Sequence, residues 1–428
     1  MQTSQIAEYI IDTFKKRGID KVQCSISDSE KKELNIDAGQ MSLFRTTFNS
    51  TIGITIYKDD CKASTSINKV DKETINDTID NLIELADSSE PDPAFDIAEF
   101  QEKKSFQSGK KCADMDAMYD KLLEFSDYTR SKYPKVILEQ AIIDFTYRKG
   151  IFANSNGVCF DIEKGIYNFS PMFTSKDGIN TSSFNYTGFS SKELKKPLYS
   201  YGSIDRLLKE SEEQIVSHSV PEKFNGQLIV TPDCLDDFIS TIMGFVTDIP
   251  LISGRSVYKD KLDKNIADSR FTLHSKPRSN QIQNNYFVTG DGYEAQDSTL
   301  IEKGILKTYL LGIYGANKTG LTRSINDGGA YIVESGSTKL NDIIKSIDQG
   351  ILLSRFSGGN PSDNGDFSGV AKNSYFVEKG EIKYPISETM ISGNICDMMK
   401  NIIDISDETV DYGDSIYPWI NFDGITVS

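Results

Sequence analysis

Histidine is almost absent from this chain. His218 and His274 are the only two among 428 residues, and they lie far apart in the sequence. No zinc motif that places two histidines on one face of a helix can therefore be built from this sequence. We interpret both as surface or capping residues, with His218 at the end of a helix and His274 in a loop, "FTLHSKPRSN".

Negative charge outweighs positive charge. The chain has 47 Lys and Arg against 63 Asp and Glu, a formal net charge of −16. Sequence-independent binding to DNA or to anionic membranes needs clustered cations, so both are excluded as main functions. No stretch approaches 18 uncharged apolar residues, and the start reads as an amphipathic helix rather than a signal peptide. We therefore expect a cytoplasmic protein that does not enter membranes.

The six cysteines include no C-x-x-C pair. In a reducing compartment this pattern predicts free, buried thiols.

Hydrophobic periodicity predicts an α+β protein of two domains. Strand-like stretches joined by turns such as "DAGQ", "KDD" and "NSNG" alternate with amphipathic helices. We place an N-terminal α+β domain at residues 1–220 and a C-terminal one at 221–428, and expect residues 95–115 to form an exposed connection. The expected helices cover residues 5–17, 72–89, 115–134, 201–219, 231–247 and 339–350.

The expected helix at 231–247 has a well-marked start. Thr231 can cap it, Pro232 suits the first helical position, and Asp233, Asp236 and Asp237 lie near the positive end of the helix dipole. Three acids on one helical turn can also coordinate a hard cation, but dipole complementarity explains them without a ligand.

Two glycine-rich stretches were tested against known ligand motifs. "TGDGYEAQDS" formally matches G-x-G-x-x-A, but an expected strand pair follows it where a dinucleotide site needs a helix. "SGGNPSDNGDFSG", residues 357–369, fails the spacing of a calcium-binding EF-hand. We interpret the first as a turn between strands and the second as a Gly/Asn/Asp loop bordering a binding cleft.

The order of several stretches is similar to the TldD/PmbA family, described in part as "modulator of DNA gyrase". They include "GQLIVTPDCLDDFISTIMGF", "SGRSVYKDKLDKNIADSRFTLHSKP", "DFSGVAKNSYFVEKGEIKYPISETMISGNICDMMKNI" and "YPWINFDGITVS". "TTFNSTIGITIYKDDCKAST" and "YRKGIFANSNGVCFDIEKG" extend the resemblance into the N-terminal half. The family implies two α+β domains and a dimer, and its TldD-type members are zinc peptidases with an H-E-x-x-x-H motif.

By this resemblance, the metal motif falls on residues 240–245. Ser240 and Phe245 stand where the two histidines would be, and Thr241 stands where the glutamate would be. The C-terminal cysteine of the zinc peptidases is missing as well, since Cys396 lies too far upstream to replace it. The resemblance therefore implies the PmbA (TldE) branch, with no metal and no catalytic residue in this chain and with zinc held only by a TldD-like partner.

The leading hypothesis is a metal-free subunit that pairs with a TldD-like zinc peptidase in peptide proteolysis or maturation. Asp291, Glu294 and Asn317 are predicted to contact the peptide, next to strand edges around "NNYFVTGDGYEA" that would hold it by β-augmentation. We expect a dimer, a homodimer when the chain is alone, without direct nucleic-acid contact. Two alternatives stay open: a self-sufficient peptidase with an unrecognised site, and a regulatory protein acting on a gyrase-related system through proteins.

Overall fold

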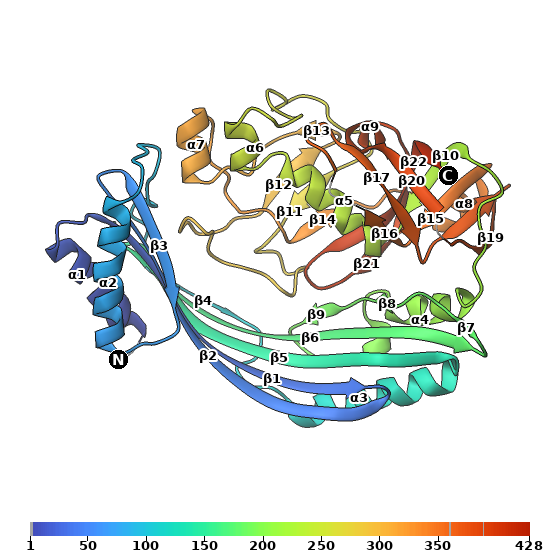
Figure 1. Cartoon of the computed structure of the whole chain (residues 1–428), viewed down its shortest axis with the longest axis horizontal. Helices are drawn as coiled ribbons and strands as arrows, with labels where there is room; N and C mark the ends of the chain where they lie inside the picture. The colour runs from blue at the N-terminus through green and yellow to red at the C-terminus, as the bar shows by residue number, and fades with distance from the viewer. Residues whose placement is uncertain (1–2, 359–360, 388) are drawn as a thin grey trace.

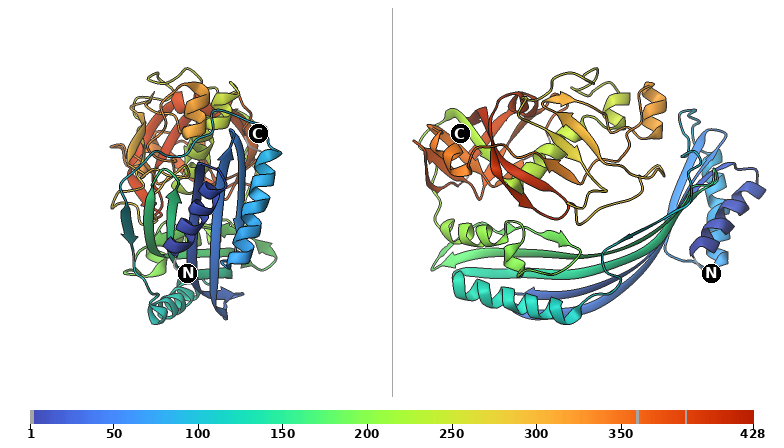
Figure 2. Two further views of the ribbon diagram at one scale, coloured as in Figure 1. Left: turned by 90° about the vertical axis from the view of Figure 1, so that its left-hand side faces the viewer. Right: turned by 180° about the vertical axis from the view of Figure 1, so that it is seen from behind.

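The computed structural model describes residues 3–358, 361–387 and 389–428. A long curved sheet forms the N-terminal part of the chain, and a second mixed sheet with short helices forms the C-terminal part (Figure 1). The C-terminal part lies on the concave side of the curved sheet, as the views in Figure 2 also show.

The curved sheet has the strand order β3-β2-β1-β5-β6-β4, with β7, β8 and β9 also paired to β6. All neighbours on the main path are antiparallel except β4, which runs parallel to β6. The strands are β1 (Lys21–Asp37), β2 (Gln40–Lys58), β3 (Cys61–Ile67), β4 (Lys104–Ser108), β5 (Val136–Asn154), β6 (Cys159–Asp177), β7 (Asn180–Thr181), β8 (Asn185–Tyr186) and β9 (Phe189–Ser191).

The two faces of this sheet differ in polarity, because successive side chains of a strand point to opposite sides. In β1 the apolar residues Val22, Cys24 and Ile26 are buried under helices on the convex face. The alternate residues of β1 are polar and turn towards the C-terminal part; they are Gln23, Ser25, Ser27, Ser29, Lys31 and Glu33. The concave face is therefore a polar surface that the C-terminal part partly covers.

Helices α1, α2 and α3 cover the convex face, whereas α4 lies between the curved sheet and the C-terminal part (Figure 1). α1 and α2 pack on one end of the sheet, and α3 and α4 contribute to a second core with β5 and β6. The bounds are α1 (Thr3–Lys16), α2 (Lys72–Asp87), α3 (Met115–Lys132), η1 (Leu198–Ser200) and α4 (Ile204–Glu213). All four α-helices were expected from the sequence, with ends within a few residues except in α4, which is shorter at both ends.

The predicted turns are confirmed by their backbone conformation. Ala38 and Gly39 between β1 and β2, and Asp59 and Asp60 between β2 and β3, all have positive φ. Two consecutive positive φ values define the two-residue hairpin turn whose twist matches antiparallel strands.

The C-terminal sheet has the order β13-β12-β11-β14-β22-β10-β15-β18-β19 and is joined by the ribbon of β16, β17 and β20 and by β21. The strands are β10 (Phe224–Val230), β11 (Leu273–Ser275), β12 (Ser298–Glu302), β13 (Ile305–Leu306), β14 (Tyr331–Val333), β15 (Gln349–Leu353), β16 (Arg355–Gly358), β17 (Asp366–Lys372), β18 (Tyr375–Glu378), β19 (Glu381–Pro385), β20 (Thr389–Asn394), β21 (Ile402–Asp411) and β22 (Ile416–Val427). The helices are α5 (Pro232–Gly244), α6 (Asp248–Ile252), α7 (Ile313–Thr319), α8 (Leu340–Lys345) and α9 (Ile395–Lys400).

The expectation of an exposed connection at residues 95–115 holds only in part: most of these residues are exposed, but a few are buried and five form a strand. Ala98 is fully buried, Phe106 packs into an apolar cluster, and Lys104–Ser108 form the edge strand β4. The side chain of Gln101 donates to the backbone carbonyl of Gly292 and accepts from the backbone N–H of Glu294, both at 3.0 Å. This segment therefore ties the curved sheet to the C-terminal part.

The expected strands around residues 284–295 are wrong, because this stretch forms only the isolated bridge of Val288 with Glu294. Its turn contains Gly292 at φ +94°, and a Cβ there would come within 2.6 Å of the Phe152 ring on β5. Close packing on the curved sheet fixes this segment instead of strand pairing. Among the described helices, none is long and apolar enough to cross a membrane.

Candidate functional site

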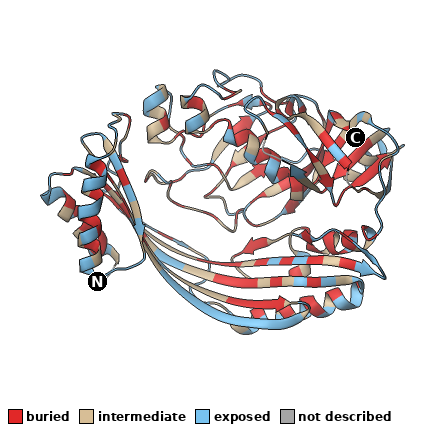
Figure 3. Cartoon of the chain, in the orientation of Figure 1, coloured by how far each residue is buried: buried red, intermediate tan, exposed pale blue. Residues whose placement is uncertain are grey.

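Helix α5 is the element that places the predicted motif positions. It buries Leu235, Phe238, Ile239 and Ile242 in the largest core of the C-terminal part, as the spacing of its apolar residues predicts (Figure 3). Its opposite side is more exposed and carries Asp236, Asp237 and Ser240. The helix therefore presents a polar stripe from a rigidly packed support.

A cavity of about 720 Å³ lies between the C-terminal half of α5 and the loop that joins β16 to β17. Phe238, Phe356 and Phe367 form an aromatic wall, with ring centroids 5.7–6.1 Å apart. The polar lining comes from two acids and three hydroxyls; these residues are Asp237, Asp363, Ser240, Thr241 and Ser357. We call this space the α5 cleft.

The loop and the motif positions meet in this cleft. Gly358, Pro361 and Asp363 line it, which confirms for the described residues that the "SGGNPSDNGDFSG" loop borders a cavity. Gly359 and Asn360 of this loop lie outside the described residues.

The three motif positions differ in how they face the α5 cleft. Ser240 is exposed, and the Thr241 hydroxyl donates to the backbone carbonyl of Asp237 at 2.9 Å. Phe245, just past the end of α5, is 9% exposed and packs edge-on against Tyr258, with ring centroids 5.9 Å apart. The position assigned to the second histidine is therefore a packed aromatic residue.

The donors at these positions do not fit a zinc ion. Catalytic zinc takes three protein ligands from histidine, carboxylate or thiolate groups, whereas these positions offer two hydroxyls and a phenyl ring. Cys396 does not line the α5 cleft, and burial raises the pKa of its thiol. Within residues 3–358, 361–387 and 389–428, no three His, Cys, Asp or Glu side chains are grouped so that they would hold a metal.

The three acids at the start of α5 have separate partners. Asp233 pairs with Arg206 of α4, and Asp236 accepts a hydrogen bond of 2.6 Å from the Tyr417 hydroxyl. Burial and the neighbouring Asp236 raise the pKa of Asp237 above its ordinary value. Asp233 and Asp236 line a second cavity, of about 680 Å³, between α5 and the curved sheet, while Asp237 lines the α5 cleft.

The residues predicted to bind peptide are engaged elsewhere in the fold. Asp291 forms a two-point ion pair with Arg323, and Glu294 pairs with Lys104 and Arg278. The Asn317 side chain donates to the backbone carbonyl of Ala94 at 3.0 Å. Asp291 supports local structure, and the other two join the C-terminal part to the curved sheet, so their peptide contact stays a prediction.

The two histidines lie apart from the α5 cleft. His218 packs edge-on against Tyr384. His274 lies in strand β11 rather than the expected loop, and its ring nitrogens are each 2.9 Å from a partner: Nδ1 from Thr299 Oγ1 and Nε2 from Glu334 Oε1. Thr299, His274 and Glu334 thus have the components of a hydrolytic triad. None of the three residues lines the α5 cleft, the second cavity beside α5, or the cavity between β1 and residues 285–290.

Sequence reasoning missed the aromatic wall and Asp363 as partners of α5. Phe356 and Phe367 come from β16 and β17, which are distant in sequence from the helix. Only the position of the glycine-rich loop between them hinted at a cleft.

The family models match both parts of this fold. "PmbA/TldA metallopeptidase C-terminal domain" matches residues 225–428, and "PmbA/TldA metallopeptidase domain 1" matches residues 22–86. The chain belongs to the TldD/PmbA family. The resemblance drawn from the sequence is thereby confirmed, and α5 with its cleft lies inside the matched C-terminal domain.

Relatives within the TldD/PmbA family cover most of the chain. The metalloprotease PmbA homolog of Haemophilus influenzae is 23% identical over 85% of this chain and 82% of its own length. Metalloprotease PmbA of Escherichia coli O157:H7 is 22% identical over 91% of this chain and 88% of its own. The crystal structure of TldE from Thermococcus kodakarensis superimposes with a TM-score of 0.85 at 18% identity, covering 99% of this chain and 100% of that one. This likeness confirms the α+β fold.

Proposed function

We propose that this chain is a non-catalytic, metal-free subunit of a peptidase whose zinc is held by a TldD-like partner. The observation that carries the proposal is the α5 cleft: an aromatic-walled cavity is present, but Ser240, Thr241 and Phe245 line it where the zinc peptidases of the family carry ligands and a general base. Without ligands, no water can be brought to a pKa near neutrality by a bound zinc ion.

An unpaired strand edge supports association with a partner. β3 pairs with β2 only from Ile52 onward, and β1 occupies the other side of β2. Residues 40–49 are exposed along this edge, as Figure 3 shows, with Phe44 at 64% and Phe48 at 74% exposure. A long exposed edge with aromatic side chains is the kind of surface that proteins cover by strand pairing or by a partner.

The polar concave face supports a role in peptide handling. Serines of β1 and the irregular segment 284–290 face one another across the space between the two parts of the chain. Surfaces rich in hydroxyl and main-chain groups bind extended peptides with little dependence on side-chain sequence. In this proposal the subunit holds the peptide and its partner cleaves it.

The proposal predicts that hydrolysis requires mixing. The purified chain alone is expected to leave a fluorescently labelled unfolded polypeptide intact, while an equimolar mixture with the zinc-bearing TldD-type subunit of the same organism cleaves it. Phe44→Ser/Phe48→Ser should weaken association of the two subunits by about tenfold or more, because two apolar contacts of a few kcal/mol are lost. Analytical ultracentrifugation measures the association and fluorescence release measures cleavage.

Phe100→Ser is the matched control, since Phe100 is also exposed, at 68%, but lies away from this strand edge. Cleavage by the chain alone that disappears on replacing His274 would overturn the proposal in favour of a self-sufficient peptidase. Equal association of the edge variant and the Phe100 control would contradict the assignment of the β2 edge.

A further inference from the structure

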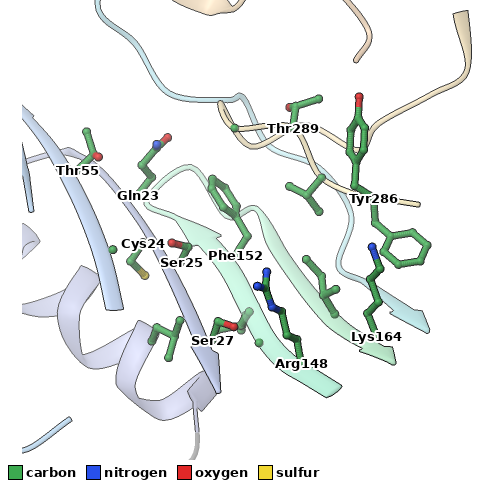
Figure 4. Close-up of a pocket in the computed structure, with 18 of the residues that line it drawn as sticks. Gln23, Cys24, Ser25, Ser27, Thr55, Arg148, Phe152, Lys164, Tyr286 and Thr289 are labelled. Carbon is green, nitrogen blue, oxygen red and sulfur yellow. The ribbon is translucent and has the colours of Figure 1, made fainter. Parts of the chain in front are cut away.

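We propose that a cavity between the curved sheet and residues 285–290 binds the C-terminal carboxylate of a peptide through Arg148 and Lys164. The cavity has a volume of about 550 Å³ and is lined by β1, β2, β5, β6 and the irregular segment (Figure 4). This assignment rests on the peptide-holding role proposed above for the concave face, but it is tested on the chain alone, so its failure is distinguishable from the absence of a zinc-bearing partner.

The lining is cationic in a strongly anionic protein. Arg148 and Lys164 are the charged residues of the lining, and no aspartate or glutamate of the described residues contributes to it. The remaining polar lining is neutral and comes chiefly from Gln23, Ser25, Ser27, Thr55 and Asn285. With a net charge of −16 over the whole chain, a cavity that contains only cations is a local exception that favours an anionic ligand.

The two cations face each other without a counter-ion. Arg148 of β5 is the direct cross-strand partner of Lys164 of β6, so their side chains rise side by side from the concave face (Figure 4). Like charges at such positions repel and destabilise a sheet. The Arg148 side chain makes no hydrogen bond or ion pair within the described part of the chain. A bound carboxylate would relieve this repulsion and suits the forked geometry of a guanidinium.

Lys164 is held in place by neutral acceptors. Its ammonium donates to Asn284 Oδ1 at 2.6 Å and to the backbone carbonyl of Asn285. Burial, together with Arg148 and Lys192, lowers the pKa of Lys164 to about 8. The ammonium is thus fixed by the segment that closes the cavity and keeps one N–H for a ligand.

Asn285 offers a hydrogen-bond acceptor beside the two cations. It is 7% exposed, and its buried side-chain oxygen Oδ1 accepts no hydrogen bond within the described structure. Buried polar atoms nearly always have a hydrogen-bond partner, so this oxygen is expected to accept a hydrogen bond from a ligand. A peptide end supplies both partners, a carboxylate for the cations and an amide N–H close to it for Asn285. Hydrogen phosphate also carries an O–H donor, so competition with phosphate is part of the test.

The test compares two peptides that differ only in their last group. Acetyl-Gly-Ala-Ala with a free carboxylate is expected to bind the purified chain in calorimetry, and the same peptide with a terminal carboxamide is expected to bind at least about tenfold more weakly, since charge-assisted hydrogen bonds are the stronger ones. Equal binding of the two peptides, or binding of neither, would overturn the proposal. Displacement by inorganic phosphate at concentrations equal to or below those of the peptide would reduce the cavity to a general anion site and overturn the peptide assignment.

Variants locate the binding. Arg148→Gln should weaken binding of the free-acid peptide by about tenfold. Because the Arg148 side chain is exposed, this substitution is expected to leave the fold intact. Lys149→Gln is the control, because this neighbour points to the opposite face and pairs with Glu163. An equal loss of affinity in both variants would place the binding outside this cavity.

Binding should also depend on pH through Lys164. Below pH 8 the ammonium is charged, and above it the charge is lost, so affinity is expected to fall between about pH 7 and about pH 9.5 while the peptide carboxylate stays ionised. Lys164→Gln should remove this pH dependence and leave the contribution of Arg148. An affinity that is independent of pH in the parent protein would contradict the role of Lys164.

Discussion

Replacing Arg206 by methionine is expected to lower the free energy of unfolding by about 3–5 kcal/mol, the cost of breaking a buried ion pair. Arg206 of α4 bonds to Glu210 at 2.8 Å and to Asp233 at the start of α5. Both acids are at most 12% exposed in their side chains. Methionine would leave two buried carboxylates without a cation, and burial already raises the pKa of Glu210 above its ordinary value.

Urea unfolding measures this effect, with Lys209→Met as the control. Lys209 occupies the same helix and pairs with Glu213, but this pair is exposed, at 68% and 43%, and exposed pairs contribute at most about 1 kcal/mol. Because Arg206 connects α4 to α5, its loss is also expected to loosen the helix that lines the α5 cleft. A loss below about 1 kcal/mol in Arg206→Met would show that the contact between α4 and α5 does not depend on this ion pair.

Replacing Asp291 by alanine is expected to cost about 3 kcal/mol of stability, which tests its role as a structural residue rather than a peptide contact. Its carboxylate accepts from Arg323 and from the backbone N–H of Ile313, the first residue of α7. The side chains of Asp291 and Arg323 are 19% and 18% exposed. The variant would leave a largely buried guanidinium without its carboxylate and remove one of the two carboxylates at the start of α7, since Asp248 remains.

The pH dependence of this effect follows from the pKa of Asp291. Burial opposes its charged form, but Arg323 and the other donors hold the pKa below its ordinary value of 3.8. A lowered pKa in the folded state gives stability that is present above pH 3.8 and is lost as the pH falls through the folded pKa. The difference between parent and variant should therefore shrink in acid.

Asp363→Ala is the control for Asp291, since Asp363 pairs with Arg255 on the surface, at 71% and 63% exposure. An unchanged stability together with weakened peptide binding in Asp291→Ala would instead support the assignment made from the sequence.

Local signals explain why most helices and turns were predictable. Helix α5 begins directly after Thr231, with Pro232 as its first residue, but the Thr231 hydroxyl makes no capping hydrogen bond. α2 and α3 begin at the capping aspartates Asp71 and Asp114. These features act over a few residues, so the sequence alone contains them.

Elements fixed by distant contacts were not predictable in this way. Short α7 was not among the expected helices, and its first N–H groups are bound by Asp248 and Asp291 from distant parts of the chain. Segment 284–295 looked strand-like, yet packing of Gly292 on Phe152 and hydrogen bonds from Gln101 fix it as an irregular wall. For α9 a local signal was present, because Asn394 caps it, and it was overlooked.

The two candidate sites also differ in how far the sequence alone could locate them. The order of segments, which resembles the family, pointed from the sequence to Ser240, Thr241 and Phe245, and these residues line the α5 cleft; their match to a metal motif stays a prediction. The cross-strand pair of Arg148 and Lys164 could not, because it depends on the register of β5 against β6. A shift of one residue in that register would move each side chain to the other face of the sheet.

The most direct test of a metal-free α5 cleft is the zinc content of the purified chain after zinc loading and desalting. Ser240, Thr241 and Phe245 predict essentially no bound zinc, measured by atomic absorption. About one zinc per chain would contradict this, because a catalytic zinc needs three protein ligands that the cleft does not provide.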